Sequence, residues 1–301
     1  MVEPTEQGPE LTPARRAAGR AGDGCDVWCA TLASLERRHT VLLDPVERTR
    51  RTAYRQRADA DRFTLGRALV RIVVGGALRI PAAGVRLDST CATCGEPHGK
   101  PRLLHVGAPG VSITHAGDRV LVAVSTAGSV GIDVESPGGS GGGSGGSGGG
   151  GSGSGGGGSG SSSTAGRDVS DLAAYVLTPG ERAHLWQLPA RRQHAAFLRY
   201  WTRKEALVKA TGRGLAHDLR RIEVSAPDQP PRVLSSTDPD HPAEVFALAD
   251  LCLPEGYVAS VAVLASGRRP LDVRLHDADP LLRRWNTRPG EASTMPPCGL
   301  G

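Results

Sequence analysis

Alternating apolar and polar positions mark the first half of the chain as rich in strands. Val111–Thr114 and Ser129–Glu135 alternate, and Arg119–Ser125 between them is rich in valine and leucine. Asp26–Thr31 and Val85–Leu87 are shorter apolar segments that also favour strands. We therefore expect a small sheet built from neighbouring segments of this half.

A helical repeat separates these strands. An arginine-dense helical region runs from Leu42 to Asp61, and a second helix is predicted from Asp61 to Leu78. The apolar residues of that second helix include Phe63, Leu65, Leu69, Ile72 and Val73. The order in the first half is thus strand, helices, strands.

The second half repeats this order at a coarse level. A short apolar helix is predicted at Val169–Leu177, a second helix begins at Thr178, and a long one runs over Ala190–Thr211. Strands then return at three segments, Arg221–Val224, Val245–Leu251 and Tyr257–Leu264. The repeated order predicts an α+β fold of two similar subdomains that face each other.

Glycine and serine alone fill Gly138–Gly160, a composition that buries no apolar surface and predicts a flexible linker. Such a run fits either an engineered linker or a natural low-complexity insertion. The expected organisation is a disordered segment, a first subdomain, the linker, a second subdomain and a tail, at residues 1–24, 25–135, 136–166, 167–270 and 271–301.

The net charge of +5 favours substrates or partners that carry phosphate or carboxylate groups. Aromatic residues make up only 4% of the chain, too few for base-stacking platforms, so we do not expect nucleic-acid binding. The polar, proline-rich start has no apolar leader, and no apolar stretch reaches the ~18 residues of a membrane span. These features predict a cytoplasmic protein with reduced cysteines.

Carboxylates at two distant places suggest a metal site. Asp133 and Glu135 share one face of their strand, because side chains repeat every two residues. Glu205 and Lys209 lie one helical turn apart, which by itself is typical of an exposed ion pair, whereas Lys204 points about 100° away. If the subdomains face each other, the three carboxylates favour a hard cation such as Mg²⁺.

Five segments together resemble the Sfp-type 4'-phosphopantetheinyl transferases. G-I-D-V-E at Gly131–Glu135 and W-T-R-K-E-A-L-V-K at Trp201–Lys209 match the two signature motifs of that family. V-S-I-T-H-A-G at Val111–Gly117 is similar to a third, with Ser112 and Thr114 replacing the usual Asn and Ser. Two further segments of the family pattern are also matched, by G-K-P at residues 99–101 and by D-R-F-T-L-G-R at residues 61–67.

The resemblance implies a pseudo-dimeric fold with the active site between the subdomains, in a monomeric chain. Members of the family use Mg²⁺ and move the 4'-phosphopantetheine arm of coenzyme A to a serine of an apo acyl or peptidyl carrier protein, releasing adenosine 3',5'-bisphosphate. The resemblance implies that Asp133, Glu135 and Glu205 are the magnesium ligands. Glu205, directly or through a water, would also be the base, and Lys209 would assist the leaving group.

The same resemblance implies a set of coenzyme A contacts. Thr114 and His115 match phosphate contacts, and Arg62 and Lys100 match residues at the nucleotide end. The full expected set is Arg50, Arg57, Arg62, Lys100, Thr114, His115, Asp133, Lys204 and Lys209. For Arg50 and Arg57 a solvated helix face is an equally good interpretation.

Two alternatives stay open at this stage. A non-catalytic module that binds coenzyme A or a carrier protein could use the same fold, although a pure binder need not keep all three carboxylates. Cys91 and Cys94, with His98 and His105 nearby, have zinc-like spacing, but a single cysteine pair is also typical of an ordinary loop with reduced thiols. Carriers of polyketide, nonribosomal peptide or fatty-acid synthesis are all candidate substrates.

Overall fold

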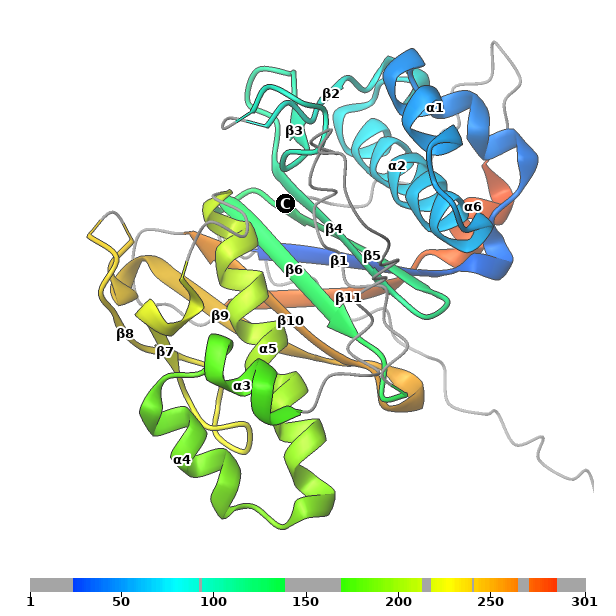
Figure 1. The fold of residues 1–301 in the computed structure, drawn as a ribbon. Helices are drawn as coiled ribbons and strands as arrows, with labels where there is room; N and C mark the ends of the chain where they lie inside the picture. The colour runs from blue at the N-terminus through cyan, green and yellow to red at the C-terminus, as the bar shows by residue number, and fades with distance from the viewer. Residues whose placement is uncertain are drawn as a thin grey trace, which may run out of the picture.

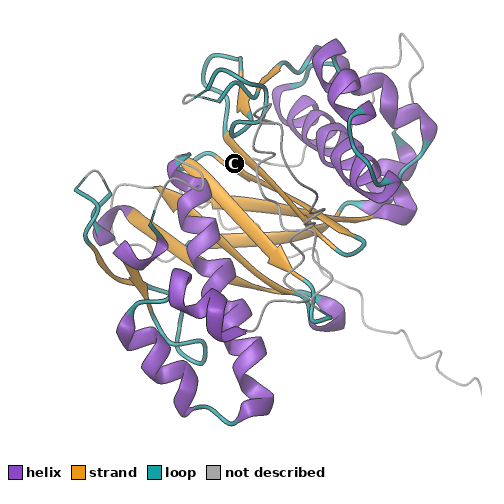
Figure 2. Ribbon diagram, in the orientation of Figure 1, coloured by secondary structure: helices purple, strands orange, loops and turns teal. Residues whose placement is uncertain are grey.

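The protein is described here from a computed structural model, which covers residues 24–91, 94–138, 169–212, 218–239, 241–264 and 271–285. It is an α+β fold, as the sequence predicts. Two main sheets lie at the centre, one with the strand order β11-β1-β5-β4 and one with the order β6-β10-β9. Figures 1 and 2 show helices gathered in two groups on opposite sides of these strands. The predicted linker, 136–166, lies outside the described residues except for its first three.

The first sheet carries the long helix α2 on one face. Its strands and the helices packed on it are β1 (Gly24–Thr31), α1 (Pro45–Thr52), α2 (Arg57–Leu78), β4 (Gly110–Ala116), β5 (Arg119–Ser125), β11 (Asp272–Asp277) and α6 (Asp279–Arg284). Leu65, Leu69 and Val73 of α2 pack on Val120 and Val122 of β5 in one apolar core. The apolar repeat predicted for this helix is therefore the face that covers the sheet.

The second sheet is covered by the other long helix. Its elements are β6 (Ser129–Glu135), α3 (Val169–Val176), α4 (Pro179–Gln187), α5 (Ala190–Thr211), β9 (Phe246–Cys252) and β10 (Val258–Leu264). The predicted helix start at Thr178 is confirmed, because its hydroxyl accepts from the Glu181 amide while the Glu181 carboxylate accepts from the Thr178 amide. The long helix ends at Gly212, which has a left-handed conformation with a φ of 76°.

Short elements connect these layers. Two small hairpins are formed by β2 (Leu87–Asp88) with β3 (Arg102–Leu103), and by β7 (Ile222–Val224) with β8 (Val233–Ser236). Brief 3₁₀ turns occupy Leu32–Ser34, Arg37–Leu42, Ala82–Gly84, Leu219–Arg221, Ala243–Val245 and Pro254–Gly256. No helix within the described ranges is long and apolar enough to cross a membrane.

A third apolar core joins the two sheets. Val130, Ile132 and Val134 of β6 pack in it together with Val27 of β1 and Val261 of β10. Where β4 and β6 run side by side, the Ile132 amide donates to the Ser112 hydroxyl at 3.2 Å. The two halves of the chain therefore share buried apolar surface and form one body.

The expected subdomain boundaries need two corrections. The strand β6 pairs with β10 over seven residues, so it belongs to the second sheet although it precedes the linker. The expected tail from residue 271 is wrong for its first part, because β11 pairs in parallel with β1 and α6 packs Leu282 into the first core. The chain thus exchanges strands between its halves. Residues 286–301 lie outside the described part.

Candidate active site

The carboxylate face of β6 is turned towards α5, as the alternation of the strand predicts. Gly131 has the closest contact, since a Cβ built there would lie 2.0 Å from the Ala206 carbonyl oxygen. The backbones of strand and helix can approach only because this position has no side chain. Asp133 and Glu135 follow on the same face, and both are buried. Figure 1 shows α5 lying across β6.

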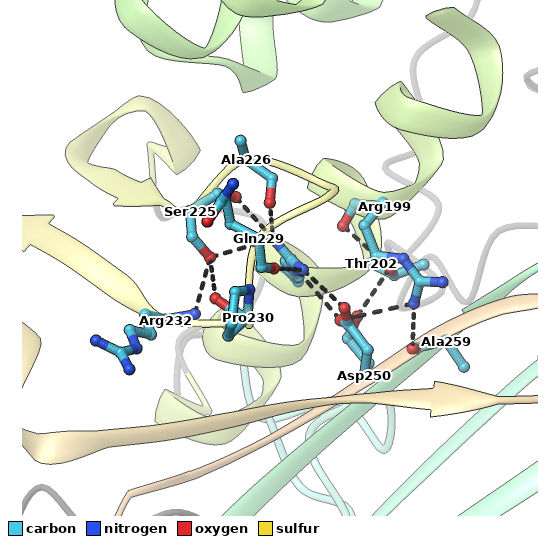
Figure 3. Close-up of polar contacts among 11 residues, drawn as sticks. Arg199, Thr202, Ser225, Ala226, Gln229, Pro230, Arg232, Asp250 and Ala259 are labelled. Atoms are coloured by element: carbon cyan, nitrogen blue, oxygen red, sulfur yellow. Dashed lines mark hydrogen bonds and ion pairs between the residues drawn. The ribbon is translucent and has the colours of Figure 1, made fainter. Parts of the chain in front are cut away.

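Arg203 fixes α5 against the second sheet. Its guanidinium is buried and makes a two-pronged contact with Asp250 of β9, at 2.7 and 3.1 Å. It also donates to the carbonyls of Ser225, Ala226 and Gln229, so the loop after β7 is held as well (Figure 3). This network sets the position of the helix two residues before Glu205.

Lys204 does not face the carboxylates. Its side chain is fully buried, its ammonium lies 2.6 Å from the Glu181 carboxylate, and it donates to three carbonyls, those of Val176, Leu219 and Ile222. Burial lowers the pKa of Lys204, and the Glu181 charge opposes that shift. The structure thus encloses the Lys204 ammonium in the core of the second half, and the contact with coenzyme A stays a prediction.

Glu205 and Lys209 do face β6. The Lys209 ammonium lies 2.5 Å from Asp133 Oδ1, and this contact joins α5 to the strand. Glu205 is 8% exposed, and its Oε1 atom is buried without a hydrogen-bond partner among the described residues. Burial raises the pKa of Glu205 to about 7, and the Asp133 charge adds to this while Lys209 opposes it.

Glu135, the last residue of β6, is the third carboxylate of this site. Its Oε1 accepts a hydrogen bond from the Trp201 indole at 3.1 Å. Burial raises the pKa of Glu135 to about 8, with a further contribution from the Asp133 charge. Burial and the neighbouring Asp133 charge both disfavour the ionised form of Glu135, and an added cation would favour it.

Asp133, Glu135 and Glu205 have the donor chemistry of a magnesium site. Three carboxylates from two elements suit a hard cation, and the buried Glu205 Oε1 offers an unused ligand atom. The oxygens of the three acids do not all lie within 4.8 Å of one another, and within the described ranges only a different group, Cys91, Cys94 and His98, meets that spacing. The donor chemistry of the three acids therefore fits Mg²⁺.

The strand β4 brings Thr114 and His115 to the same region. Thr114 is fully buried and donates to Asp133 Oδ1 at 3.3 Å, so here it serves the carboxylate rather than an open phosphate site. Burial lowers the pKa of His115 to about 4, and the charges of Arg62 and Lys209 lower it further. His115 Nδ1 is buried with no hydrogen-bond partner within the described ranges. This ring nitrogen is therefore available for a ligand that enters the region.

Arg62 lies at the edge of this region. It donates to the Gly117 carbonyl at 2.7 Å and pairs with Asp59 at 2.8 Å. Gly66, one turn later, lets α2 approach β4, because a Cβ there would meet the Ile113 side chain at 2.8 Å. The prediction places Arg62 at the nucleotide end, and the structure puts it within electrostatic reach of His115.

Lys100 bridges the two halves. Its ammonium donates to the Ser129 hydroxyl at 2.6 Å and to the Ala210 carbonyl of α5 at 3.0 Å. Burial lowers the pKa of Lys100 to about 8. Lys100 lies on the loop that follows Cys91, and its ammonium is held near the end of α5.

Arg50 and Arg57 lie farther out. Arg50 donates to the Pro97 carbonyl at 2.6 Å and stacks over Phe63 at 5.2 Å from the ring centre. The Arg57 side chain is 93% exposed and lies 3.5 Å from Asp61. The structure thus supports the solvated-face interpretation for Arg57, whereas Arg50 joins α1 to the loop that carries Lys100.

Two residues that hold the site together were not predicted from the sequence. Trp201 and Arg203 stand inside the signature segment, but their partners, Glu135 and Asp250, are far away in the chain. A buried arginine among apolar helix positions was a usable signal for Arg203, since such a charge needs a partner. Nothing in the sequence indicates which carboxylate that partner is.

Comparison with known proteins identifies the family of this chain. A family model described as the 4'-phosphopantetheinyl transferase superfamily matches residues 161–262. The 4'-phosphopantetheinyl transferase HetI of Nostoc sp. (strain PCC 7120) is 30% identical over 212 residues, which cover 69% of this chain and 73% of HetI. A putative 4'-phosphopantetheinyl transferase of Synechocystis sp. (strain PCC 6803), slr0495, is 25% identical over 199 residues, 65% of this chain and 68% of the relative. The 4'-phosphopantetheinyl transferase psf-1 of Bacillus pumilus is 25% identical over 187 residues, 62% of this chain and 65% of psf-1.

Proposed function

Because the chain belongs to the 4'-phosphopantetheinyl transferase superfamily and is an enzyme of that class with coenzyme A as substrate, we propose that its acceptor is a serine hydroxyl of apo acyl or peptidyl carrier proteins and that it needs Mg²⁺. The observation that carries the proposal is the meeting of Asp133, Glu135 and Glu205 between β6 and α5, with Lys209 beside them. A monomer in the cytoplasm, serving carriers of polyketide, nonribosomal peptide or fatty-acid synthesis, is part of the proposal.

Asp133, Glu135 and Glu205 would hold the magnesium ion. When bound, the ion would neutralise the negative charge that develops on the pyrophosphate as the phosphoanhydride breaks. The buried Glu205 Oε1 supports this assignment, because a carboxylate oxygen that lacks a partner is costly unless it has a ligand to bind.

The transfer itself is a displacement at phosphorus. The carrier serine oxygen forms a bond to the phosphorus that bears the pantetheine arm, and the bond from that phosphorus to the bridging oxygen breaks. Adenosine 3',5'-bisphosphate leaves with the electron pair of that bond. The serine proton goes to Glu205, directly or through a water.

Lys209 and His115 are proposed to hold the phosphates of coenzyme A. The Lys209 ammonium already lies against Asp133, so a short swing of a flexible side chain would bring it to a pyrophosphate oxygen. His115 is kept neutral by its surroundings and can donate one ring N–H to a phosphate oxygen. Arg62 is proposed to act at the nucleotide end, and Lys100 to line the adenine side.

The test is transfer to a panel of apo carrier proteins from the three pathways, with coenzyme A and Mg²⁺, followed by the intact mass of each carrier. We expect a gain of one phosphopantetheine on at least one carrier. Asp133→Asn and Glu205→Gln should each lower the rate at least about 100-fold without unfolding the protein, whereas Asp228→Asn, at an exposed turn, should keep the wild-type rate. Full rates in both active-site variants would refute the metal assignment.

The non-catalytic module that the sequence left open would bind coenzyme A with no mass gain on any carrier. Membership of the transferase family argues against this alternative. The buried carboxylate group argues against it, because a module that only binds an anion gains nothing from three acids near that anion.

A further inference from the structure

The loop between β2 and β3 folds back on itself into a compact turn. The Cys91 amide donates to the Glu96 carbonyl at 2.8 Å, and the Gly95 amide returns to the Cys91 carbonyl at 2.9 Å. Gly95 has a φ of 77°, a left-handed conformation that suits a residue without a side chain. At the base, the Gly99 amide donates to the Ser89 carbonyl at 2.6 Å. The backbone therefore brings both arms of the loop together.

This turn gathers three side chains that bind soft metals. The ligand atoms of Cys91, Cys94 and His98 all lie within 4.8 Å of one another, and no other group of three such residues in the described part of the chain does so. Cys94 Sγ is 2.9 Å from His98 Nε2. All three side chains are exposed or half-buried, so an ion from solution can reach them.

We propose that Cys91, Cys94 and His98 bind a zinc ion, with a water as the fourth ligand. Zinc–sulfur and zinc–nitrogen distances of about 2.3 and 2.1 Å imply ligand atoms roughly 3.6 Å apart in a tetrahedron. The Sγ–Nε2 distance of 2.9 Å needs to open by less than ~1 Å to reach this geometry. Two residues between the cysteines, and a glycine after the second, are the spacing of a zinc-binding turn.

The neighbouring side chains leave these three residues as the ligand set. His105 Nε2 accepts a hydrogen bond from the Arg86 amide at 3.1 Å, so it faces away from the turn. The Asp88 carboxylate accepts from Thr90 and Arg102. Two thiolates balance the charge of Zn²⁺ without a carboxylate, and sulfur ligands select zinc over magnesium. This ion and the magnesium proposed between β6 and α5 are therefore distinct.

The loop that the zinc would hold also links the two halves of the protein. Arg50 of α1 donates to the Pro97 carbonyl, next to His98. Lys100, two residues after His98, reaches Ser129 and the Ala210 carbonyl at the end of α5. A metal that fixes Cys91–His98 would therefore fix the point where Lys100 crosses to the second half. We assign it a structural role, because its ligands lie on the loop that carries Lys100.

Zinc content of the full-length chain tests the site. After removal of metals and titration with ZnCl₂ under reducing conditions, we expect one tightly held zinc per chain. Cys94→Ser and His98→Asn should each weaken zinc binding at least about tenfold. Cys252→Ser, an exposed cysteine outside the turn, and Asp133→Asn, at the carboxylate group, should bind zinc as the wild type does. Replacing zinc with Co²⁺ should give a thiolate-to-cobalt charge-transfer band that Cys94→Ser weakens.

Three results would overturn the proposal. They are zinc binding by the wild type that stays far below one equivalent, binding that Cys94→Ser and His98→Asn leave unchanged, and binding that Asp133→Asn removes. A second readout is hydrogen exchange of residues 94–101, which zinc should slow in the wild type and leave unchanged in Cys94→Ser. Neither measurement depends on transfer to a carrier, so the zinc site and the proposed function can fail separately.

Discussion

Lys204 offers the sharpest test of the structure, because the family resemblance assigns it to the coenzyme A site and the fold assigns it to the core. As a coenzyme A contact it would be needed for substrate affinity. In the fold it is a buried partner of Glu181, 2.6 Å away, and a donor to three carbonyls. Lys204→Met separates these two roles, because it keeps an unbranched side chain and removes only the charge and its donors.

The expected loss of stability can be worked out from these contacts. The substitution leaves the Glu181 carboxylate buried without its cation, although it still accepts from the Thr178 and Val224 amides. Removing one partner of a buried ion pair costs about 3–5 kcal/mol. With a urea m-value of about 2–3 kcal/mol per molar, the unfolding midpoint should fall by about 1–2.5 M. Lys204→Met/Glu181→Gln should recover part of this loss, because no buried charge then remains.

The assay is urea unfolding followed by circular dichroism, together with the KM for coenzyme A of the folded variant. Arg57→Met is the control, since its side chain is 93% exposed and its replacement should change stability by no more than about 0.5 kcal/mol. The reasoning is refuted if Lys204→Met keeps the wild-type midpoint but raises the KM for coenzyme A tenfold. That outcome would return Lys204 to the substrate site.

Three further predictions follow from the carboxylate face. Gly131→Ala should destabilise the protein and lower the transfer rate at least about tenfold, because the new Cβ would meet the backbone of α5 at 2.0 Å and push the helix away. Gly138→Ala is the control, since a Cβ there has nothing within 4 Å and should change neither stability nor rate. Urea unfolding and the transfer assay measure both effects. Glu205→Gln should stabilise the metal-free protein at pH 8 by up to about 3 kcal/mol. The reason is that the pKa of Glu205 is raised from 4.5 to about 7 in the folded state, so the wild type loses stability as pH rises through this interval. The gain should vanish near pH 4, and urea unfolding at both pH values measures it. His115→Ala should raise the Kd of coenzyme A about tenfold in calorimetry and leave stability within about 1 kcal/mol, and an unchanged Kd would contradict a phosphate contact.

Local patterns in the sequence were sufficient for the main elements. The bounds of β5, β6 and α5 are those that the patterns predict, because each element buries one face and repeats its apolar positions with the matching period. The shared face of Asp133 and Glu135 follows from the same alternation. Matching segments also sufficed for the family, since their order along the chain is a property of the sequence alone.

Pairing between distant segments was decided only by the tertiary structure. The strand β11 was missed although Val273 and Leu275 alternate with polar residues, because this pattern is short. Most of its side chains are exposed, and the strand is held by its backbone ladder with β1. β6 was assigned to the wrong half for a related reason, since alternation gives its faces but not its neighbour. Lys204 was predicted to point away from Glu205, and only the fold shows that this direction leads to Glu181 in the core. The sequence thus determines what each element can bury, whereas the partner of each face and each charge depends on which segments the folded chain brings together.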